Sequence, residues 1–191
     1  MGDLLLVRHG ETAWSAAHRH TGLTDVPLSE RGEDQARSLR GRLAGLPVVA
    51  SFVSPLQRAQ RTAELAGLSA LGPVTVDPDL LEWDNGLYEG RTTADIRGEV
   101  PGWWLWTDGA PGGETWEQVQ PRCERSIDRA LPHLEHGDVV LVGHGHTLRA
   151  VAAVWLGLPA SQGGLFTMEP ARLSALGTYR DHRVVKLWDA P

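Results

Sequence analysis

Leu4-Leu5-Leu6-Val7-Arg8-His9-Gly10 is an apolar run that ends in a cation, an imidazole and a glycine. The run has the length and composition of a buried strand, and the glycine lets the backbone approach a bound group closely. Two further apolar runs end similarly, because Ser51-Phe52-Val53 is soon followed by Arg58, and residues 139–142 by Gly143-His144-Gly145. In an open α/β sheet the ends of neighbouring strands face one crevice. The sequence therefore predicts that two arginines and two histidines form a phosphate pocket that contains a nucleophile.

Strand and helix patterns alternate along the rest of the chain. Residues 74–76 and two segments near 172–179 and 183–188 have strand character, and the last two are expected to form an antiparallel edge. Helices are expected after Ser29 as an N-cap, after Ser54-Pro55 as N-cap and first residue, and from about residue 147 to 156. This alternation predicts a three-layer α/β/α sandwich with a mainly parallel sheet, in one domain over residues 1–191.

Two regions are harder to assign. Thr115 with Gln118 resembles a capping box for a long helix, but Pro121 is unfavourable inside a helix, so the helix begins either at Thr115 or near Pro121. Residues 79–113 are expected to be mostly loop with one short helix, and they contain four of the eight tryptophans.

Composition limits the partners. With 191 residues, 41% hydrophobic and 22% charged residues, the chain has the profile of a globular protein. Its net charge of −6 and the lack of a basic run argue against nucleic acid or a membrane surface as a partner. Cys123 is the single cysteine, so no disulfide forms within the chain, and no apolar stretch is long enough for a signal peptide or a membrane span. We therefore expect a cytoplasmic protein.

The residue types at the strand ends fit phosphoryl transfer. This reaction needs an in-line nucleophile, cations on the phosphate oxygens and a proton for the leaving oxygen. Neutral imidazole attacks phosphorus without a metal, so His9 is the candidate nucleophile. Arg8 and Arg58 can each bind phosphate oxygens with two nitrogens, and His144, when protonated, would add a third positive donor.

Several motifs resemble those of one family. The matching segments are Arg8-His9-Gly10-Glu11-Thr12, Thr21-Gly22 with Asp25, Leu28-Ser29 and Gly32, Ser54-Pro55-Leu56-Gln57-Arg58-Ala59-Gln60-Arg61-Thr62-Ala63, Leu81-Glu82 with Gly86 and Glu89-Gly90, Gly112-Gly113-Glu114-Thr115, and Gly143-His144-Gly145 with Arg149. They span residues 4–150 in the family's order. On these motifs the chain is identified as a member of the histidine phosphatase superfamily, the phosphoglycerate-mutase-like group, and it most resembles a branch of small acid phosphatases.

The resemblance implies roles for single residues. His9 would carry the phosphoryl group, with Arg8, Arg58 and His144 as its catalytic partners, and Glu82 rather than Glu89 would be the general acid. Burial beside Trp83 is expected to raise the pKa of Glu82. The substrate-binding set implied by the motifs is Arg8, Ser15, Thr21, Gly22, Arg58, His144 and Gly145. Ser15 stands where many members have Asn, and His146 stands where Gly or Asn is more usual.

The expected activity is hydrolysis of small phosphorylated metabolites without a metal or other cofactor, with inorganic phosphate as a product. An acidic optimum is expected, since Glu82 must start protonated and His144 charged. A non-catalytic phosphate-binding module is an alternative, although it would be expected to lack one of the five catalytic residues. A metal site at the pairs His144 and His146 or His18 and His20 has little support.

A phosphoglycerate mutase is the second alternative. A mutase needs extra basic side chains, whereas residues 91–111 contain Arg91 and Arg97 against three acids. Hydrolysis is therefore favoured. The nearby tryptophans, Trp103, Trp104 and Trp106, would favour substrates with an apolar body if they lined the entrance. The favoured interpretation is that they form a core patch or a subunit contact, as in a homodimer.

Overall fold

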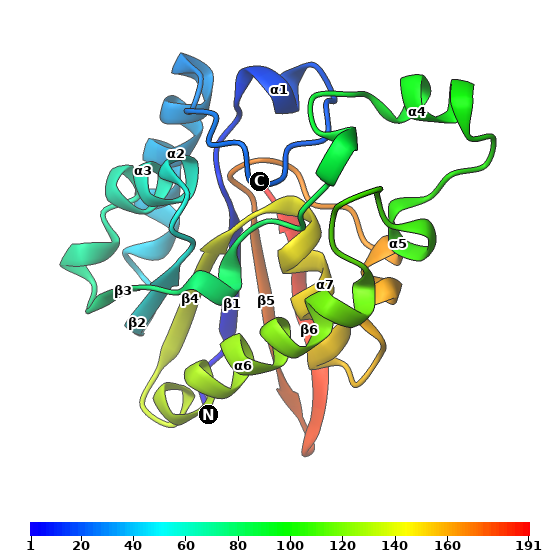
Figure 1. Cartoon of the computed structure of the whole chain (residues 1–191). Coiled ribbons are helices and arrows are strands. Elements are labelled where there is room, and N and C mark those ends of the chain that lie inside the picture. Colours follow the sequence, from blue (N-terminus) through cyan, green and yellow to red (C-terminus); the bar gives the residue numbers. More distant parts are fainter.

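The computed structural model describes residues 1–191 and is built on one six-stranded sheet (Figure 1). The strands are β1 (Leu4–Arg8), β2 (Val48–Val53), β3 (Val74–Val76), β4 (Asp138–Gly143), β5 (Leu173–Tyr179) and β6 (His182–Ala190). Their order across the sheet is β3-β2-β4-β1-β5-β6. The first four pair in parallel, whereas β5 is antiparallel to both β1 and β6. The predicted mainly parallel sheet with an antiparallel edge is confirmed.

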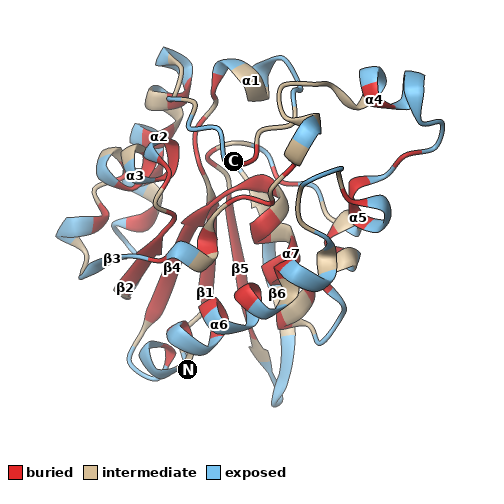
Figure 2. Ribbon diagram, viewed as in Figure 1, coloured by how far each residue is buried: buried red, intermediate tan, exposed pale blue.

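Helices cover both faces of this sheet. The α-helices are α1 (Ala13–Ala16), α2 (Glu30–Leu43), α3 (Gln57–Leu65), α4 (Thr93–Glu99), α5 (Leu105–Asp108), α6 (Trp116–Leu134) and α7 (Gly145–Trp155), and the 3-10 helices are η1 (Leu68–Ala70), η2 (Pro78–Leu80), η3 (Gly86–Tyr88) and η4 (Ala160–Leu165). One apolar cluster lies between the sheet and α2 and α3, and a larger one lies on the side of α6 and α7. The inner strands β2, β4, β1 and β5 are accordingly buried between two layers of helices, whereas the edge strands β3 and β6 are largely exposed (Figure 2).

The register of the parallel strands determines where the site forms. Arg8 of β1 lies opposite Gly143 of β4, and Val142 of β4 lies opposite Val53 of β2. The next residues, His9, Ser54 and His144, therefore leave the sheet side by side. The backbone N–H of His9 donates to the carbonyl of Gly143 (2.9 Å), which extends the pairing by one residue.

Local signals predict some helix starts and fail at one. Ser29 caps α2, since its side chain accepts the N–H of Gly32, and Thr115 with Gln118 forms the capping box of α6. The long helix thus begins at Trp116 and continues through Pro121, because buried side chains before and after the proline keep it packed on the sheet. The prediction that Ser54-Pro55 caps α3 is wrong. The helix begins at Gln57 with Leu56 as its N-cap, and the Ser54 hydroxyl contacts His144 instead.

The segment between β3 and α6 contains two short α-helices, α4 and α5, where one was expected. Trp103 and Trp106 are buried in the larger cluster, and Trp104 is 42% exposed. No helix combines the length and apolarity that a membrane crossing requires.

Candidate active site

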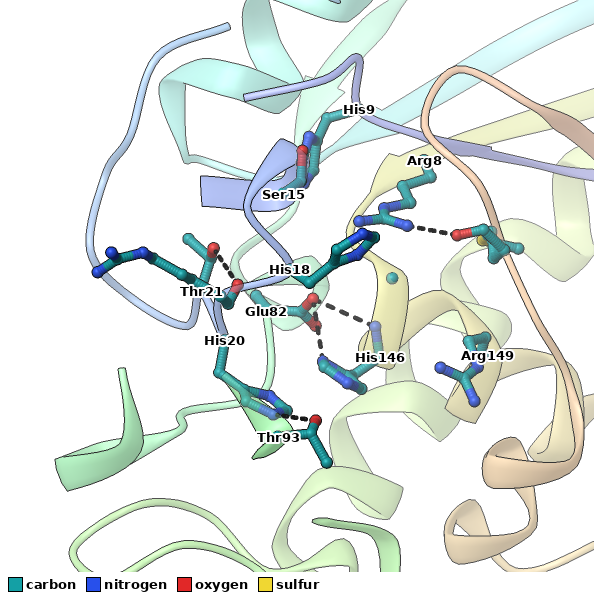
Figure 3. Close-up of a pocket in the computed structure, with 13 residues that line it drawn as sticks. Arg8, His9, Ser15, His18, His20, Thr21, Glu82, Thr93, His146 and Arg149 are labelled. Atoms are coloured by element: carbon teal, nitrogen blue, oxygen red, sulfur yellow. Dashed lines mark hydrogen bonds and ion pairs between the residues drawn. The ribbon is translucent and has the colours of Figure 1, made fainter. Parts of the chain in front are cut away.

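A polar pocket of about 270 Å³ lies where β1 and β4 end (Figure 3). Glu82 is the one carboxylate among its lining residues, and Met168 is the one hydrophobic side chain. The lining residues are Arg8, His9, Ser15, His18, Arg19, His20, Thr21, Glu82, Thr93, Gly145, His146, Arg149 and Met168. Cations and imidazoles dominate this set, so the pocket suits an anion.

His9 is held as a neutral imidazole with one free nitrogen. Its side chain is buried, and Nδ1 lies 2.7 Å from the carbonyl oxygen of Gly10. Because that oxygen can only accept, Nδ1 carries the proton and Nε2 keeps its lone pair. Burial lowers the pKa of His9 to about 3, and the charges of Arg8 and Arg58 act in the same direction. His9 therefore stays unprotonated well into the acid range.

Gly10 makes this placement possible. A Cβ on residue 10 would lie 2.3 Å from the carbonyl oxygen of Gly32, where backbone atoms leave no room for it. The glycine thus lets the loop after β1 lie directly against the start of α2, with the N–H of Gly10 donating to the Thr62 hydroxyl (3.1 Å).

Arg8 lines the same pocket, and one of its N–H donors has no acceptor in the protein. One guanidinium nitrogen donates to the carbonyl of Met168, while Nε is buried and has no partner. Burial lowers the pKa of this side chain from its very high ordinary value. A buried donor without an acceptor is costly, so a ligand oxygen that accepts from Arg8 would be favoured here.

Arg58 and His144 lie close to His9 but do not line the pocket. Arg58 is buried, and its Nε donates to Nδ1 of His144 (3.1 Å), while its other nitrogens donate to the carbonyls of Thr24 and Gly22 (2.9 and 2.8 Å). Since Nδ1 of His144 accepts, its proton is on Nε2, which donates to the Ser54 hydroxyl (2.7 Å). Burial and the charge of Arg58 hold the pKa of His144 well below its usual value. The expected protonated His144 is thus wrong for the ligand-free protein.

Glu82 accepts hydrogen bonds from the start of α7. Oε1 accepts the N–H groups of Trp83 and Thr147 (2.9 Å each), and Oε2 accepts the N–H of His146 (3.2 Å). Burial by itself would raise the pKa of this carboxyl, but the rings of His146 and His144 and the N–H of Trp83 lower it well below the usual range. The expectation of a raised pKa is therefore wrong for the free protein, in which Glu82 is ionised.

Glu89, the rival carboxylate, has a different position. Oε2 accepts the N–H of Thr24 (3.1 Å), and its oxygens also bind the Thr24 hydroxyl and the N–H of Leu23. Glu89 does not line the pocket. It fixes the loop whose carbonyls hold Arg58, which is a structural position.

The smaller residues of the expected binding set divide into two groups. Ser15, Thr21 and Gly145 line the pocket, whereas Gly22 lies behind it as an acceptor for Arg58. The Ser15 hydroxyl accepts the N–H of Thr12 (2.9 Å) and donates to its carbonyl (3.1 Å), so its proton is already used. A Cβ on residue 145 would approach Nε of Arg8 to 3.3 Å, which shows how closely α7 lies to this cation.

Sequence reasoning did not assign several lining side chains to the site, above all His20, His146 and Arg149. The rings of His20 and His146 stack with centroids 5.9 Å apart, and the Arg149 guanidinium lies 4.7 Å from the centre of the Trp106 ring. Burial lowers the pKa of Arg149 to about 10. One signal could have found two of them, because His146 and Arg149 are three residues apart on one face of a helix that starts at the site.

Two tryptophans of the tryptophan-rich segment pack against the imidazoles of His20 and His146. Trp103 contacts the ring of His20 edge-on (5.2 Å between centroids), and Trp106 contacts the ring of His146 in the same way (5.6 Å). None of Trp103, Trp104 and Trp106 lines the pocket, so these side chains do not form an apolar entrance to it. No group of three His, Cys, Asp or Glu side chains comes together as a metal site.

The comparison with family models agrees with this geometry. Residues 4–191 match the model of the histidine phosphatase superfamily (branch 1). The chain belongs to this superfamily. As a histidine phosphatase it is a phosphoric monoester hydrolase, and its phosphoglycerate-mutase-like fold is that of its structural neighbours.

Individual histidine phosphatases are similar over most of their length. An acid phosphatase of Mycobacterium tuberculosis is 45% identical over 179 residues, which cover 91% of this chain and 85% of that protein. A sedoheptulose 1,7-bisphosphatase of Saccharomyces cerevisiae is 38% identical, over 81% of this chain and 67% of the other. The solved structure of a mycobacterial glucosyl-3-phosphoglycerate phosphatase in complex with VO3 superposes with a TM-score of 0.89 at 29% identity and covers 100% of both chains.

Proposed function

We propose that this histidine phosphatase hydrolyses monoesters of small, polar phosphorylated metabolites through a phosphohistidine on His9, without a metal. The observation that carries this proposal is the free Nε2 of a neutral His9 in a pocket where Arg8 has an unpartnered buried Nε. A nucleophile and a cation for the phosphate oxygens are then already in place before substrate binds.

In the first step Nε2 of His9 forms a bond to phosphorus as the bond to the ester oxygen breaks. Arg8 holds the non-bridging oxygens, and Arg58 keeps His144 in position beside His9, with the two imidazole centroids 5.2 Å apart. The leaving oxygen receives its proton from Glu82 and departs as a neutral alcohol. In the second step water attacks phosphorus, its proton goes to Glu82, and inorganic phosphate forms while His9 is released.

The ionised state of Glu82 in the free protein requires a change on substrate binding. A doubly charged phosphoryl group placed in the pocket disfavours a second negative charge nearby, and this raises the pKa of the carboxyl. Glu82 then takes up a proton as substrate binds.

The polar lining favours polar substrates. Of the thirteen lining residues only Met168 is hydrophobic, and seven are arginines or histidines. The similarity to an acid phosphatase and to two phosphatases named for sugar phosphates or a glycosylated phosphoglycerate supports the same class.

Hydrolysis is favoured over mutase activity by the two arginines of residues 91–111. Arg91 forms an ion pair with Glu99 (2.6 Å), and Nε of Arg97 donates to the carbonyl of Trp103 (2.9 Å). Neither lines the pocket, so this segment offers no basic grip for a sugar acid. Conversion of one phosphoglycerate isomer to the other at a rate comparable with phosphate release would reverse this assignment.

Rapid-quench labelling tests the covalent step. The wild type, mixed with an ester that carries radioactive phosphate, should retain acid-labile, base-stable label on His9, and His9→Gln should lose at least about 10⁴-fold in turnover. His182→Gln, at an exposed histidine of β6, is the matched control and should keep label and turnover.

Activity should persist after dialysis against EDTA. Product formation without label, or activity restored only by added metal, would refute the mechanism; failure to turn over any aryl phosphate would favour a binding module.

A further inference from the structure

The imidazole of His146 lies directly against the carboxylate that the proposed reaction uses as its acid. Nδ1 of His146 is 3.6 Å from Oε2 of Glu82, and the backbone N–H of His146 donates to the same oxygen (3.2 Å). Nδ1 is buried and has no hydrogen-bond partner. At 3.6 Å the two atoms are slightly too far apart for a hydrogen bond. A small shift of the His146 ring would bring Nδ1 into hydrogen-bond distance of Oε2, where a proton can pass between them.

Glu82 has few other routes to a proton. Its Oε1 is surrounded by the N–H groups of Trp83 and Thr147 and the Thr147 hydroxyl (3.1 Å), which donates to it. Those groups stabilise the ionised carboxylate and do not release protons at ordinary pH. Oε2 faces His146 and the pocket, where Figure 3 shows the two side chains pointing toward one another. The proton that Glu82 needs therefore reaches it at Oε2, where His146 is the titratable side chain in contact.

The other groups that face His146 determine which imidazole holds the proton. His20 stacks on it from the loop after α1, Trp106 of α5 makes an edge-to-face contact with it, His144 is the N-cap of its helix and Arg149 belongs to that helix. Burial, aided by the charge of His146, lowers the pKa of His20 to about 4. Arg8, from the end of β1, and Arg149 oppose further positive charge in the pocket, and Glu82 favours it at His146. Of the two stacked rings, His146 is the one whose nitrogen lies against Glu82.

We propose that His146 is a positioning residue that loads Glu82 with its proton, an inference that rests on the proposed function. When the phosphate ester binds, the Nδ1–H bond of the His146 imidazolium breaks and an O–H bond forms on Glu82, so the pair becomes neutral. Glu82 then protonates the leaving oxygen as the ester bond breaks. In the second half, the proton that water gives to Glu82 returns to Nδ1, and the starting state is restored.

Two variants test this role by different readouts. In His146→Asn the backbone N–H to Glu82 remains, but the titrating ring is gone. We expect kcat for an alkyl phosphate to fall about 10–100-fold and to lose its alkaline limb, whereas an aryl phosphate, whose leaving group needs little protonation, changes less than about 3-fold. In His146→Ala, added imidazole should restore the alkyl rate at least in part. Thermal melting of both variants checks that they are folded.

His18→Asn is the matched control, since His18 lines the same pocket without a hydrogen bond or ion pair to Glu82. Its φ of 53° is a conformation that asparagine adopts readily. This variant should keep the alkaline limb, and imidazole should not affect its rate. An unchanged pH profile in His146→Asn, equal slowing of alkyl and aryl esters, or no rescue of His146→Ala would overturn the proposal. Each result is distinct from failure of the proposed function, in which the wild type itself forms no phosphohistidine.

Discussion

The rings of His9 and His144 have centroids 5.2 Å apart, but they carry their protons on different nitrogens. The proton is on Nδ1 in His9 and on Nε2 in His144, and in each ring one hydrogen bond at Nδ1 determines this. Nδ1 of His9 donates to the Gly10 carbonyl, whereas Nδ1 of His144 accepts from Arg58. The free nitrogen of His9 can therefore form a bond to phosphorus, while both nitrogens of His144 are bound to protein. A phosphate that displaces the Ser54 hydroxyl from Nε2 of His144 would gain a donor without any change in protonation.

At the residue scale, we expect Glu82→Gln to slow alkyl phosphates by about 10²–10⁴-fold and aryl phosphates much less. An amide cannot donate its proton to the leaving oxygen, although it can still accept the N–H of Thr147 and so keep most of the local structure. Steady-state kinetics on a matched series of leaving groups would measure the difference. Equal slowing across the series would remove Glu82 from the acid role.

The sequence was enough to predict that Arg8, His9 and Glu82 lie near one another, but it did not predict the lining residues His20, His146 and Arg149 or the charge states of the groups. His9, Arg8, Glu82 and the others are adjacent to strand ends or to family motifs, and such local patterns are visible in a single chain. The protonation of Glu82 depends above all on the rings of His146 and His144, more than sixty positions away along the chain. Contacts of that separation leave no local signal, so the raised pKa expected from burial alone was wrong.

At the scale of elements, Arg122 of α6 joins the segment that carries Glu82 to the rest of the fold. Its side chain donates to the carbonyl of Leu81 (2.7 Å) and forms a two-nitrogen pair with Glu114 (3.1 and 3.0 Å). Glu114 in turn accepts the N–H of Asp84 (2.9 Å). Arg122, which is mostly buried, thus holds the chain on both sides of Glu82, directly at Leu81 and through Glu114 at Asp84.

We expect Arg122→Met to lower the free energy of unfolding by about 3 kcal/mol, because it leaves the Glu114 carboxylate without its partner in a mostly buried position. Arg125→Met is the matched control. Arg125 lies one turn away and pairs with Asp79, but its side chain is 57% exposed, so the cost should stay below about 1 kcal/mol. Urea unfolding of both variants would compare them. Equal losses would show that Arg122 is no more important than a surface pair.

Most of the elements that have a local sequence signal form as predicted. The Ser29 cap of α2 and the apolar strands are confirmed, and of the two starts left open for α6 the structure has the one at the Thr115 capping box. Ser54 looks like a helix cap because serine before proline usually is one, yet the register of β2 and β4 brings its hydroxyl to His144. The second short helix before α6 was also not predicted, since buried tryptophans rather than helical periodicity hold that segment.

At the scale of the whole molecule, we expect stability to fall in acid. Burial holds the pKa of His9 at about 3 and that of His20 at about 4, below the ~6.5 of an unfolded imidazole. The unfolded chain then binds more protons than the folded one between these values, so stability that is complete above about pH 6.5 is lost as the pH falls through this window. The lowered pKa of Glu82 acts the same way at lower pH.

The loss should be on the order of several kcal/mol between about pH 7 and about pH 4. Urea midpoints at the two pH values would measure it, and His9→Gln and His20→Asn should each show a smaller loss than the wild type. Identical pH dependence in all three proteins would contradict the origin assigned to it. Inorganic phosphate, if it binds only the folded protein, should reduce the loss in the wild type.

The segment of residues 84–114 begins and ends at the same place, next to Glu82. The N–H of Glu114 donates to the carbonyl of Asp84 (3.0 Å), and the indole of Trp83 donates to the carbonyl of Glu114 (2.8 Å). With its stem closed in this way, those parts of the segment that contact neither the Arg58 loop nor the imidazoles could vary while the reacting groups stay where they are. Evolution can thus alter what the enzyme recognises at Thr93, the one residue of this segment that lines the pocket, and a laboratory chimera that takes α4 from a relative should acquire the donor's preference for one ester over another.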